Sequence, residues 1–394
     1  MTSSLCDDVD IHDSQFVVDP FPTYRRLRGE CPVAHGSRHG GFTLLTRYAD
    51  VREAARDWRT YTSSVIGVTA IPVITPRSEP QLPIEVDPPE HSTYRALINP
   101  VFAMGRVERL RPRIHAIARQ LAQACSRKPS ADLVRDYAVP LSVGTLAEFT
   151  GLPPKDSRRW VAWITLMFDV RDREAGARAS RQFGEYIDEL IAARRRRPRN
   201  DFLSVLMEAQ VDGRKLTDHE LHSFCTVVFG AGFETTADAM SLALQYLAEQ
   251  PDTRRLIRDQ PELIPSAVEE FLRYGTPIQI FGRNATRDIE IHGATIPAGR
   301  IVALCFASAN RDESVFRTPE RLVVERSPNP HLTFGAGPHQ CVGSSVARLE
   351  LAITLELFTQ DMPEFRLDPA AASIWKARGD RRGLRSLPVV FGTS

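Results

Sequence analysis

The stretch Phe334-Gly335-Ala336-Gly337-Pro338-His339-Gln340-Cys341-Val342-Gly343 sets one cysteine among glycines, shortly before a run of helix-forming residues. A cysteine at the entrance to a helix faces the partly positive end of the helix dipole, so we expect this position to favour a thiolate. The glycines allow a tight turn and a close approach to a flat ring. Thiolates bind soft metal ions, including haem iron. The stretch therefore predicts a thiolate ligand at Cys341, with His339 placed to donate to an acidic group at the edge of the ring.

The remaining cysteines have no such neighbours, and we expect each of them to be a small buried hydrophobic residue. They are Cys6, Cys31, Cys125, Cys225 and Cys305. The absence of a CxxC motif or paired spacing argues for a reducing compartment and against disulfides. The sequence has neither a signal-like N-terminus nor a run of about 18 apolar residues. We therefore expect a soluble, cytoplasmic protein without membrane association.

The composition of the 394-residue chain predicts a large buried core and no polyanionic partner. It is 42% hydrophobic and has a formal net charge of +1, so we do not expect it to bind nucleic acid. Helical periodicity dominates from His91 to about Gln250, and short strand signals lie on both sides of it. We predict one mainly α-helical domain with small β-sheets over residues 1–394, in which residues 1–20 are irregular, and we expect a monomer.

The segment from Thr217 to Gln250 predicts a single long helix. Thr217 and Glu220 form a capping box at its start, and Pro251 ends it. At 1.5 Å per residue the helix would be roughly 50 Å long and would cross the molecule. Within it, Phe229-Gly230-Ala231-Gly232-Phe233-Glu234-Thr235-Thr236 contains two glycines, each unfavourable by about 1 kcal/mol in a helix. A close approach by a ligand would explain them.

Three motifs of this sequence resemble those of the cytochrome P450 family. Residues 334–343 match the haem-binding pattern FGxGxHxCxG, and residues 231–235 match the oxygen-activation signature AGx(D/E)T. Glu270 and Arg273 match the ExxR motif, and they share a helical face on which they can pair. The resemblance implies a single cytochrome P450-type domain, with haem b between the long helix and the cysteine loop.

The resemblance also implies roles for particular residues. Cys341 would be the axial ligand, Gly232 would leave room for O2, and Glu234 and Thr235 would be catalytic and deliver protons. The Thr235 hydroxyl can bond to the Ala231 carbonyl and open the helix locally. Arg321 would complete a buried network with Glu270 and Arg273. The predicted cofactor-binding residues are His91, Arg95, Ala231, Arg283, Phe334, His339, Cys341 and Gly343.

The function implied is a haem-thiolate monooxygenase that inserts one oxygen atom of O2 into a small, mainly hydrophobic substrate. Electrons would come from a ferredoxin and its reductase, docked near Arg106, Arg109, Arg111 and Arg113, although a plain solvated helix face explains these arginines equally well. The alternatives are a peroxide-driven haem-thiolate peroxygenase and a non-catalytic haem or gas-binding protein. The pocket is expected to be lined by residues 63–86, by 160–183 with Trp160, Trp163 and Phe168, by Val228 and Phe229, by 277–281 and by 382–386.

Overall fold

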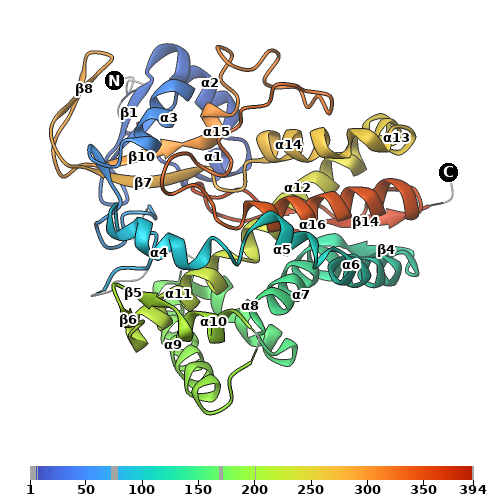
Figure 1. Cartoon of the computed structure of the whole chain (residues 1–394). Coiled ribbons are helices and arrows are strands. Elements are labelled where there is room, and N and C mark those ends of the chain that lie inside the picture. The colour runs from blue at the N-terminus through green and yellow to red at the C-terminus, as the bar shows by residue number, and fades with distance from the viewer. Residues whose placement is uncertain (1–5, 7, 72–78, 168–171, 200, 393–394) are drawn as a thin grey trace.

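The computed structural model describes residue 6 and residues 8–71, 79–167, 172–199 and 201–392. Helices form about half of this chain (Figure 1). The α-helices are α1 (Ser14–Val18), α2 (Phe21–Glu30), α3 (Tyr48–Arg56), α4 (Glu90–Ile98), α5 (Met104–Glu108), α6 (Arg111–Ser126), α7 (Val139–Thr150), α8 (Ser157–Met167), α9 (Arg173–Arg196), α10 (Phe202–Glu208), α11 (Asp218–Ala231), α12 (Glu234–Glu249), α13 (Pro251–Asp259), α14 (Ile264–Gly275), α15 (Phe306–Ala309) and α16 (Ser344–Glu356). Short π-helices are η1 (Val134–Ala138) and η4 (Leu357–Asp361), and 3-10 helices are η2 (Pro154–Asp156) and η3 (Pro261–Leu263).

The strands form small sheets, and the largest has five strands in the order β1-β2-β10-β7-β3. A three-stranded sheet has the order β11-β14-β4, and the pairs β12-β13, β5-β6 and β8-β9 are hairpins or short ribbons. The strands are β1 (Val33–Gly36), β2 (Phe42–Leu45), β3 (Tyr61–Thr62), β4 (Ser130–Asp132), β5 (Gln210–Val211), β6 (Arg214–Lys215), β7 (Ile280–Ala285), β8 (Ile289–Ile291), β9 (Ala294–Ile296), β10 (Ile301–Cys305), β11 (Phe365–Leu367), β12 (Ile374–Trp375), β13 (Leu384–Ser386) and β14 (Pro388–Phe391). Strands β1, β7, β8 and β10 lie on the side of the N-terminus, whereas β4 and β14 lie on the side of the C-terminus (Figure 1). The predicted class, mainly α with small sheets, is confirmed.

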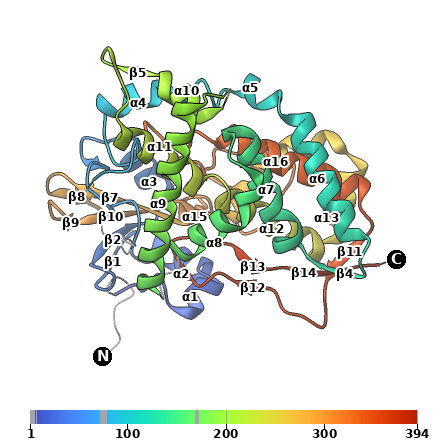
Figure 2. The same cartoon turned by 90° about the horizontal axis from the view of Figure 1, so that it is seen from below.

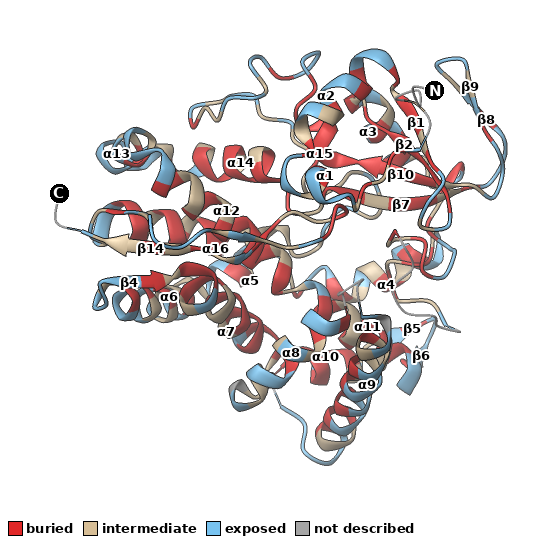
Figure 3. Cartoon of the chain, turned by 180° about the vertical axis from the view of Figure 1, so that it is seen from behind, coloured by how far each residue is buried: buried red, intermediate tan, exposed pale blue. Residues whose placement is uncertain are grey.

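Helices α7, α12, α14 and α16 form the buried centre of the helical part, where Figure 3 shows mostly buried residues. Helix α12 contacts α7, α14 and α16 as well as strand β11. In Figure 2 the strands β12 and β13 run alongside α12, and β13 contacts it. Among the described residues, no helix has both the length and the apolar character needed to cross a membrane.

The predicted long helix is interrupted, because α11 ends at Ala231 and α12 begins at Glu234. Its expected ends are confirmed: Thr217 and Glu220 form the capping box, and α12 stops just before Pro251. The helix breaks here because the Thr235 hydroxyl donates to the Ala231 carbonyl at 3.1 Å and so competes with the backbone amides for this acceptor. The prediction of one continuous helix is therefore wrong.

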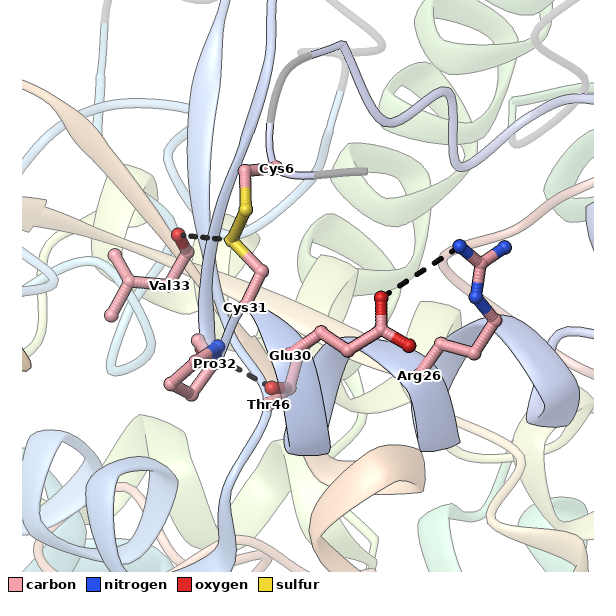
Figure 4. Close-up of a disulfide and its surroundings, with 7 residues drawn as sticks. All are labelled: Cys6, Arg26, Glu30, Cys31, Pro32, Val33 and Thr46. Carbon is pink, nitrogen blue, oxygen red and sulfur yellow. Dashed lines mark hydrogen bonds and ion pairs between the residues drawn. A yellow bond between two sulfur atoms is a disulfide. The ribbon is translucent and has the colours of Figure 1, made fainter. Parts of the chain in front are cut away.

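The N-terminal segment departs from prediction in two respects. Residues 14–18 form helix α1 instead of an irregular stretch, with Asp13 as its N-cap. Cys6 and Cys31 form a disulfide, with 5.6 Å between their Cα atoms (Figure 4). The His35 amide donates to the Cys6 carbonyl at 2.8 Å and the Val9 amide to the His35 carbonyl at 2.8 Å, so Cys6 and Val9 lie beside β1. This pairing depends on tertiary structure, which cysteine spacing does not reveal.

Candidate active site

The loop from Phe334 to Gly343 joins the segment after α15 to helix α16, and its backbone is held tightly. The Cys341 amide donates to the Phe334 carbonyl at 2.9 Å, which closes the loop on itself. Gly335 and Gly337 have φ angles of +70° and +72°, a region that side chains disfavour. A Cβ atom at Gly337 would also lie 2.7 Å from the Ala55 carbonyl oxygen. The glycines are therefore required by backbone conformation and by packing against α3.

Cys341 lines a deep cavity of ≈850 Å³ and its side chain is accessible from that cavity. Its position inside the protein raises the pKa of the thiol, and a bond from the Gly343 amide and the charges of Arg95 and Arg348 offset this only in part. Because a metal ion displaces the thiol proton when it binds, ionisation of Cys341 depends on the metal.

The opposite wall of the cavity is the break between α11 and α12. Ala231, Gly232 and Thr235 all line it, so the predicted signature and the cysteine loop face a common space. The predicted bond from Thr235 to Ala231 is confirmed. At Gly232 a Cβ atom would lie 2.6 Å from the Val228 carbonyl oxygen and 2.9 Å from Leu146 Cδ1. Local packing thus requires this glycine whether or not a ligand approaches it.

Two buried nitrogen-bearing side chains near the cysteine loop fit an anionic group. Arg283 lines the cavity and is only 4% exposed, and burial lowers the pKa of its guanidinium to about 10, which still leaves it charged at neutral pH. His91 Nδ1 is buried without a hydrogen-bond partner. Buried cations and donors are normally paired, so a carboxylate of a group bound in the cavity would satisfy Arg283. His91 does not line the cavity, and burial lowers its pKa to about 3, so its neutral ring offers a hydrogen-bond donor and no charge. The two propionates of haem b supply such carboxylates.

Arg95 and His339 also line the cavity, and of these two Arg95 carries the charge, because burial lowers the pKa of His339. The His339 Nε2 atom lies 3.4 Å from Asp87 Oδ1, and its ring centroid lies 4.3 Å from that of His91. Burial would raise the pKa of Asp87, but bonds from His339, Thr62 and the Ser63 amide outweigh it and lower the value to about 2. Arg95 donates to the Gln340 carbonyl at 2.8 Å, which ties α4 to the cysteine loop. These residues therefore fit the cofactor that the sequence predicts.

Phe334 and Gly343 also line the cavity, whereas Glu234 turns away from it. Glu234 Oε1 lies 2.9 Å from Lys376 Nζ, and Oε2 lies 2.9 Å from Arg381 Nη1. Burial would raise the pKa of Glu234, but these two cations lower it, so the side chain is a carboxylate at neutral pH. The contacts of Lys376 and Arg381 with this motif were not predicted, because both residues lie more than 100 positions further along the chain. Of the two predicted catalytic residues, Thr235 lines the cavity and Glu234 does not.

The ExxR motif forms the expected buried pair, but the third member of the network is not Arg321. Arg326 Nε donates to Glu270 Oε2 at 3.0 Å, whereas Arg321 contributes only its backbone carbonyl, which accepts from Arg273 at 3.1 Å. The exposed Arg321 side chain points elsewhere because the segment after it turns back toward α14. The turn places Arg326 and Asn329 on the same carboxylate.

The predicted pocket segments mostly reach the cavity, with corrections at particular side chains. Residues from the loop after β3, Val228 and Pro277, Ile278 and Phe281 line it. Trp160 is instead a core residue whose Nε1 donates to Tyr186 at 3.2 Å, and Phe229 is also buried in the core. Phe168 lies outside the described residues. At the C-terminal turn the lining residue is Arg381, which precedes the predicted stretch 382–386.

A cavity lined by the Cys341 loop, by the opened helix and by the cations Arg95 and Arg283 fits the class of haem-thiolate oxygenases. The profile of the family "Cytochrome P450" matches residues 159–372. Cytochrome P450 CYP107DY1 of Priestia megaterium is 38% identical over 78% of this chain and 76% of its own length. Vitamin D(3) 25-hydroxylase of Pseudonocardia autotrophica is 33% identical over 100% of this chain and 98% of its own.

The solved structure of the Bacillus subtilis 168 bacillaene polyketide synthase cytochrome P450 PksS superposes with a TM-score of 0.89. It shares 32% sequence identity and covers 98% of this chain and 100% of its own. The chain belongs to the cytochrome P450 family. It is accordingly a haem-iron oxidoreductase of the bacterial monooxygenase type, which uses haem b and O2.

Proposed function

We propose that this cytochrome P450 holds haem b through Cys341 and oxidises a small, mainly hydrophobic organic molecule. The observation that carries the proposal is the common cavity between the Cys341 loop and the Ala231–Thr235 break. Arg283, Arg95, His91 and His339 would bind the propionates, with Phe334 and Gly343 against the ring. The bound haem supplies O2 binding and activation, which no side chain provides.

In this proposal Glu234 and Thr235 manage protons. The Thr235 hydroxyl reaches the cavity, and its bond to Ala231 holds it at the opened turn. Glu234 is buried and ionised, so it can take up a proton and release it to its neighbour. A carboxylate next to a hydroxyl at a helix break gives a route for protons into the cavity.

The class of substrate is inferred from the side chains that line the cavity. Most side chains that face the cavity are apolar, including Ile98, Phe102, Phe149, Val228 and Phe281. Charged lining residues lie both in buried positions, as Arg283 and Glu350 do, and in exposed ones, as in the contact of 2.7 Å between His222 and the 67% exposed Asp188. An apolar body with a polar end that faces solvent would match this distribution. The similarity to an enzyme named for vitamin D(3) hydroxylation agrees with a hydrophobic substrate.

We further propose that a ferredoxin and its reductase deliver the electrons, docking on the side of the cysteine loop. Two of the predicted docking arginines are already paired, since Arg111 binds Glu108 at 2.9 Å and Arg113 binds Glu148 at 3.1 Å. Arg106 and Arg109 are the better candidates. A monomeric state and a cytoplasmic location remain predictions, and the Cys6–Cys31 disulfide is a feature that cytosolic proteins rarely carry.

The test is spectroscopic first and catalytic second. The reduced protein with carbon monoxide should show the red-shifted Soret band of a thiolate-ligated haem, and Cys341→Ala should lose it. Turnover with a surrogate ferredoxin and reductase should fall in Thr235→Ala while haem is retained. Full activity with hydrogen peroxide alone would favour a peroxygenase, and haem binding without any turnover would favour a gas-binding protein.

A further inference from the structure

The segment after β12 carries a cluster of buried charges against helix α12. Its cations are Lys376, Arg378 and Arg381, and the acids among them are Glu234, Asp238 and Asp380. Arg378 pairs with Asp380 of its own segment, whereas Lys376 and Arg381 reach across to α12. Glu234 belongs to the proposed proton route, but the function does not use Asp238.

Asp238 lies one helical turn after Glu234 and is only 2% exposed. Lys376 Nζ lies 2.8 Å from Asp238 Oδ1 and 2.9 Å from Glu234 Oε1, so one ammonium group bridges the two carboxyl groups. Asp238 Oδ2 is buried without a hydrogen-bond partner. A Cβ atom at Gly383 would collide with the Asp238 carboxyl group, so the chain presses closely on it at this point.

We propose that Asp238 stores a proton and passes it to Glu234 through Lys376, as a second acid of the distal proton supply. Lys376 Nζ gives one proton to Glu234 Oε1 and takes one from the Asp238 carboxyl group. Asp238 then becomes a carboxylate, Glu234 becomes a neutral acid, and Lys376 ends as the ammonium it was. No electron is transferred and no other reactant is consumed.

The electrostatics of the cluster favour storage of the proton on Asp238, and because the pKa of Glu234 is lowered, the transfer to Glu234 is uphill and is completed only when Glu234 passes the proton on. Burial raises the pKa of Asp238 to about 7, although Lys376 acts against the rise, so the group can both hold and release a proton near neutral pH. The charged groups that act on it are Lys376, Arg381 and Arg378 from the segment after β12, and Glu234 from α12 itself. A buried oxygen without a hydrogen-bond partner is less unfavourable in a neutral carboxyl group than in a charged carboxylate.

A purely structural role is the competing explanation, in which the ion pairs only fasten the β12–β13 segment to α12. Lys376→Arg separates the two explanations. Arginine keeps the positive charge and can bond to both carboxyl groups, but it does not give up a proton at any working pH. A fastening role would survive this substitution, whereas proton transfer through residue 376 would not.

The first measurement is infrared difference spectroscopy of the ferric holoprotein as a function of pH. The wild type should show the carbonyl stretch of a protonated carboxyl group that disappears as the pH rises through about 7, and Asp238→Asn should lack it. Glu350, whose pKa is also raised, contributes a second band, which Glu350→Gln assigns separately. Identical spectra for wild type and Asp238→Asn would overturn the proposal.

The second measurement is product formed per electron pair consumed, with a surrogate ferredoxin and reductase. Asp238→Asn and Lys376→Arg should each lower this ratio by about tenfold, with the lost electrons recovered as hydrogen peroxide. Glu249→Gln, at the exposed end of the same helix, is the matched control and should behave as wild type. A wild-type ratio in Lys376→Arg would overturn the proposal even if Asp238→Asn binds too little haem for assay.

The inference rests on the proposed proton role of Glu234, and the two can fail separately. If Glu234→Gln impairs turnover while Asp238→Asn and Lys376→Arg do not, only the storage role of Asp238 is excluded. If Glu234→Gln itself turns over as wild type, the proposed route through Glu234 fails.

Discussion

Arg273 binds both carboxylate oxygens of Glu270, at 2.8 Å through Nε and at 2.8 Å through Nη2, and neither side chain is exposed. The remaining donors of Arg273 reach the carbonyls of Asn310, Pro319 and Arg321. A buried pair of this kind is stable only when its other donors and acceptors are satisfied as well. The pair therefore fixes the course of the chain that leads to the Cys341 loop.

Arg326→Ala should destabilise the protein and lower its haem content, because it removes a partner from the buried Glu270 carboxylate. We expect a loss of about 1–3 kcal/mol in the free energy of unfolding. Arg321→Ala is the matched control, since its exposed side chain takes no part in the network, and it should stay within about 0.5 kcal/mol of wild type. Urea unfolding and the haem-to-protein ratio measure both effects. Equal losses in the two variants would contradict the assignment of Arg326.

Arg283→Gln should weaken haem binding, because Arg283 is a buried cation facing the cavity. Truncating one partner of a buried charge pair commonly costs several kcal/mol, so we expect haem affinity to fall by about ten- to a hundredfold. Haem transfer to apomyoglobin, followed by absorbance, gives the rate and extent of loss. Arg287→Gln changes an exposed arginine just beyond the same strand and should retain haem as wild type does.

Glu350→Gln should change how stability depends on pH. Burial raises the pKa of Glu350 to about 8 against its usual 4.5, with the bond from Ser142 opposing the rise. Between these two values the unfolded chain has lost the proton and the folded chain has kept it, so the stability of the wild type falls as the pH rises. Glutamine cannot titrate and removes this contribution.

From pH 5 to pH 8 the free energy of unfolding of the wild type should therefore fall by about 2–4 kcal/mol relative to that of Glu350→Gln. Thermal unfolding midpoints of both holoproteins across this range test it. Parallel curves for the two proteins would show that Glu350 is ionised throughout.

Replacing Cys6 and Cys31 by serine should lower stability without changing the haem spectrum. The disulfide closes a loop with a sequence separation of 25, and cross-links of this length stabilise by about 2–4 kcal/mol. The double variant and the reduced wild type should unfold at the same denaturant concentration. A shift of the carbon monoxide band would instead show that the N-terminal segment reaches the active site.

The sequence predicted the cofactor and most of the cavity from local patterns. Cys341 and Thr235 could be identified because the glycine-rich loop and the local opening of the helix depend on residues that are neighbours in the sequence. In the structure both residues line the same cavity. The sequence predicted the bond from Thr235 to Ala231 and a local opening of the helix, but not the division of the segment into the two helices α11 and α12.

The family, the predicted ligand residue, the pair Glu270–Arg273 and the mainly helical class could be read from the sequence, because each depends on residues close together in the chain. The meeting of distant side chains could be seen only in the folded structure: Arg326 with Glu270, Lys376 with Glu234 and Asp238, and Cys6 with Cys31. These contacts join segments far apart in sequence, so their partners are fixed by how helices and loops pack. For the same reason, the pKa of Cys341 depends on burial that its own loop does not show.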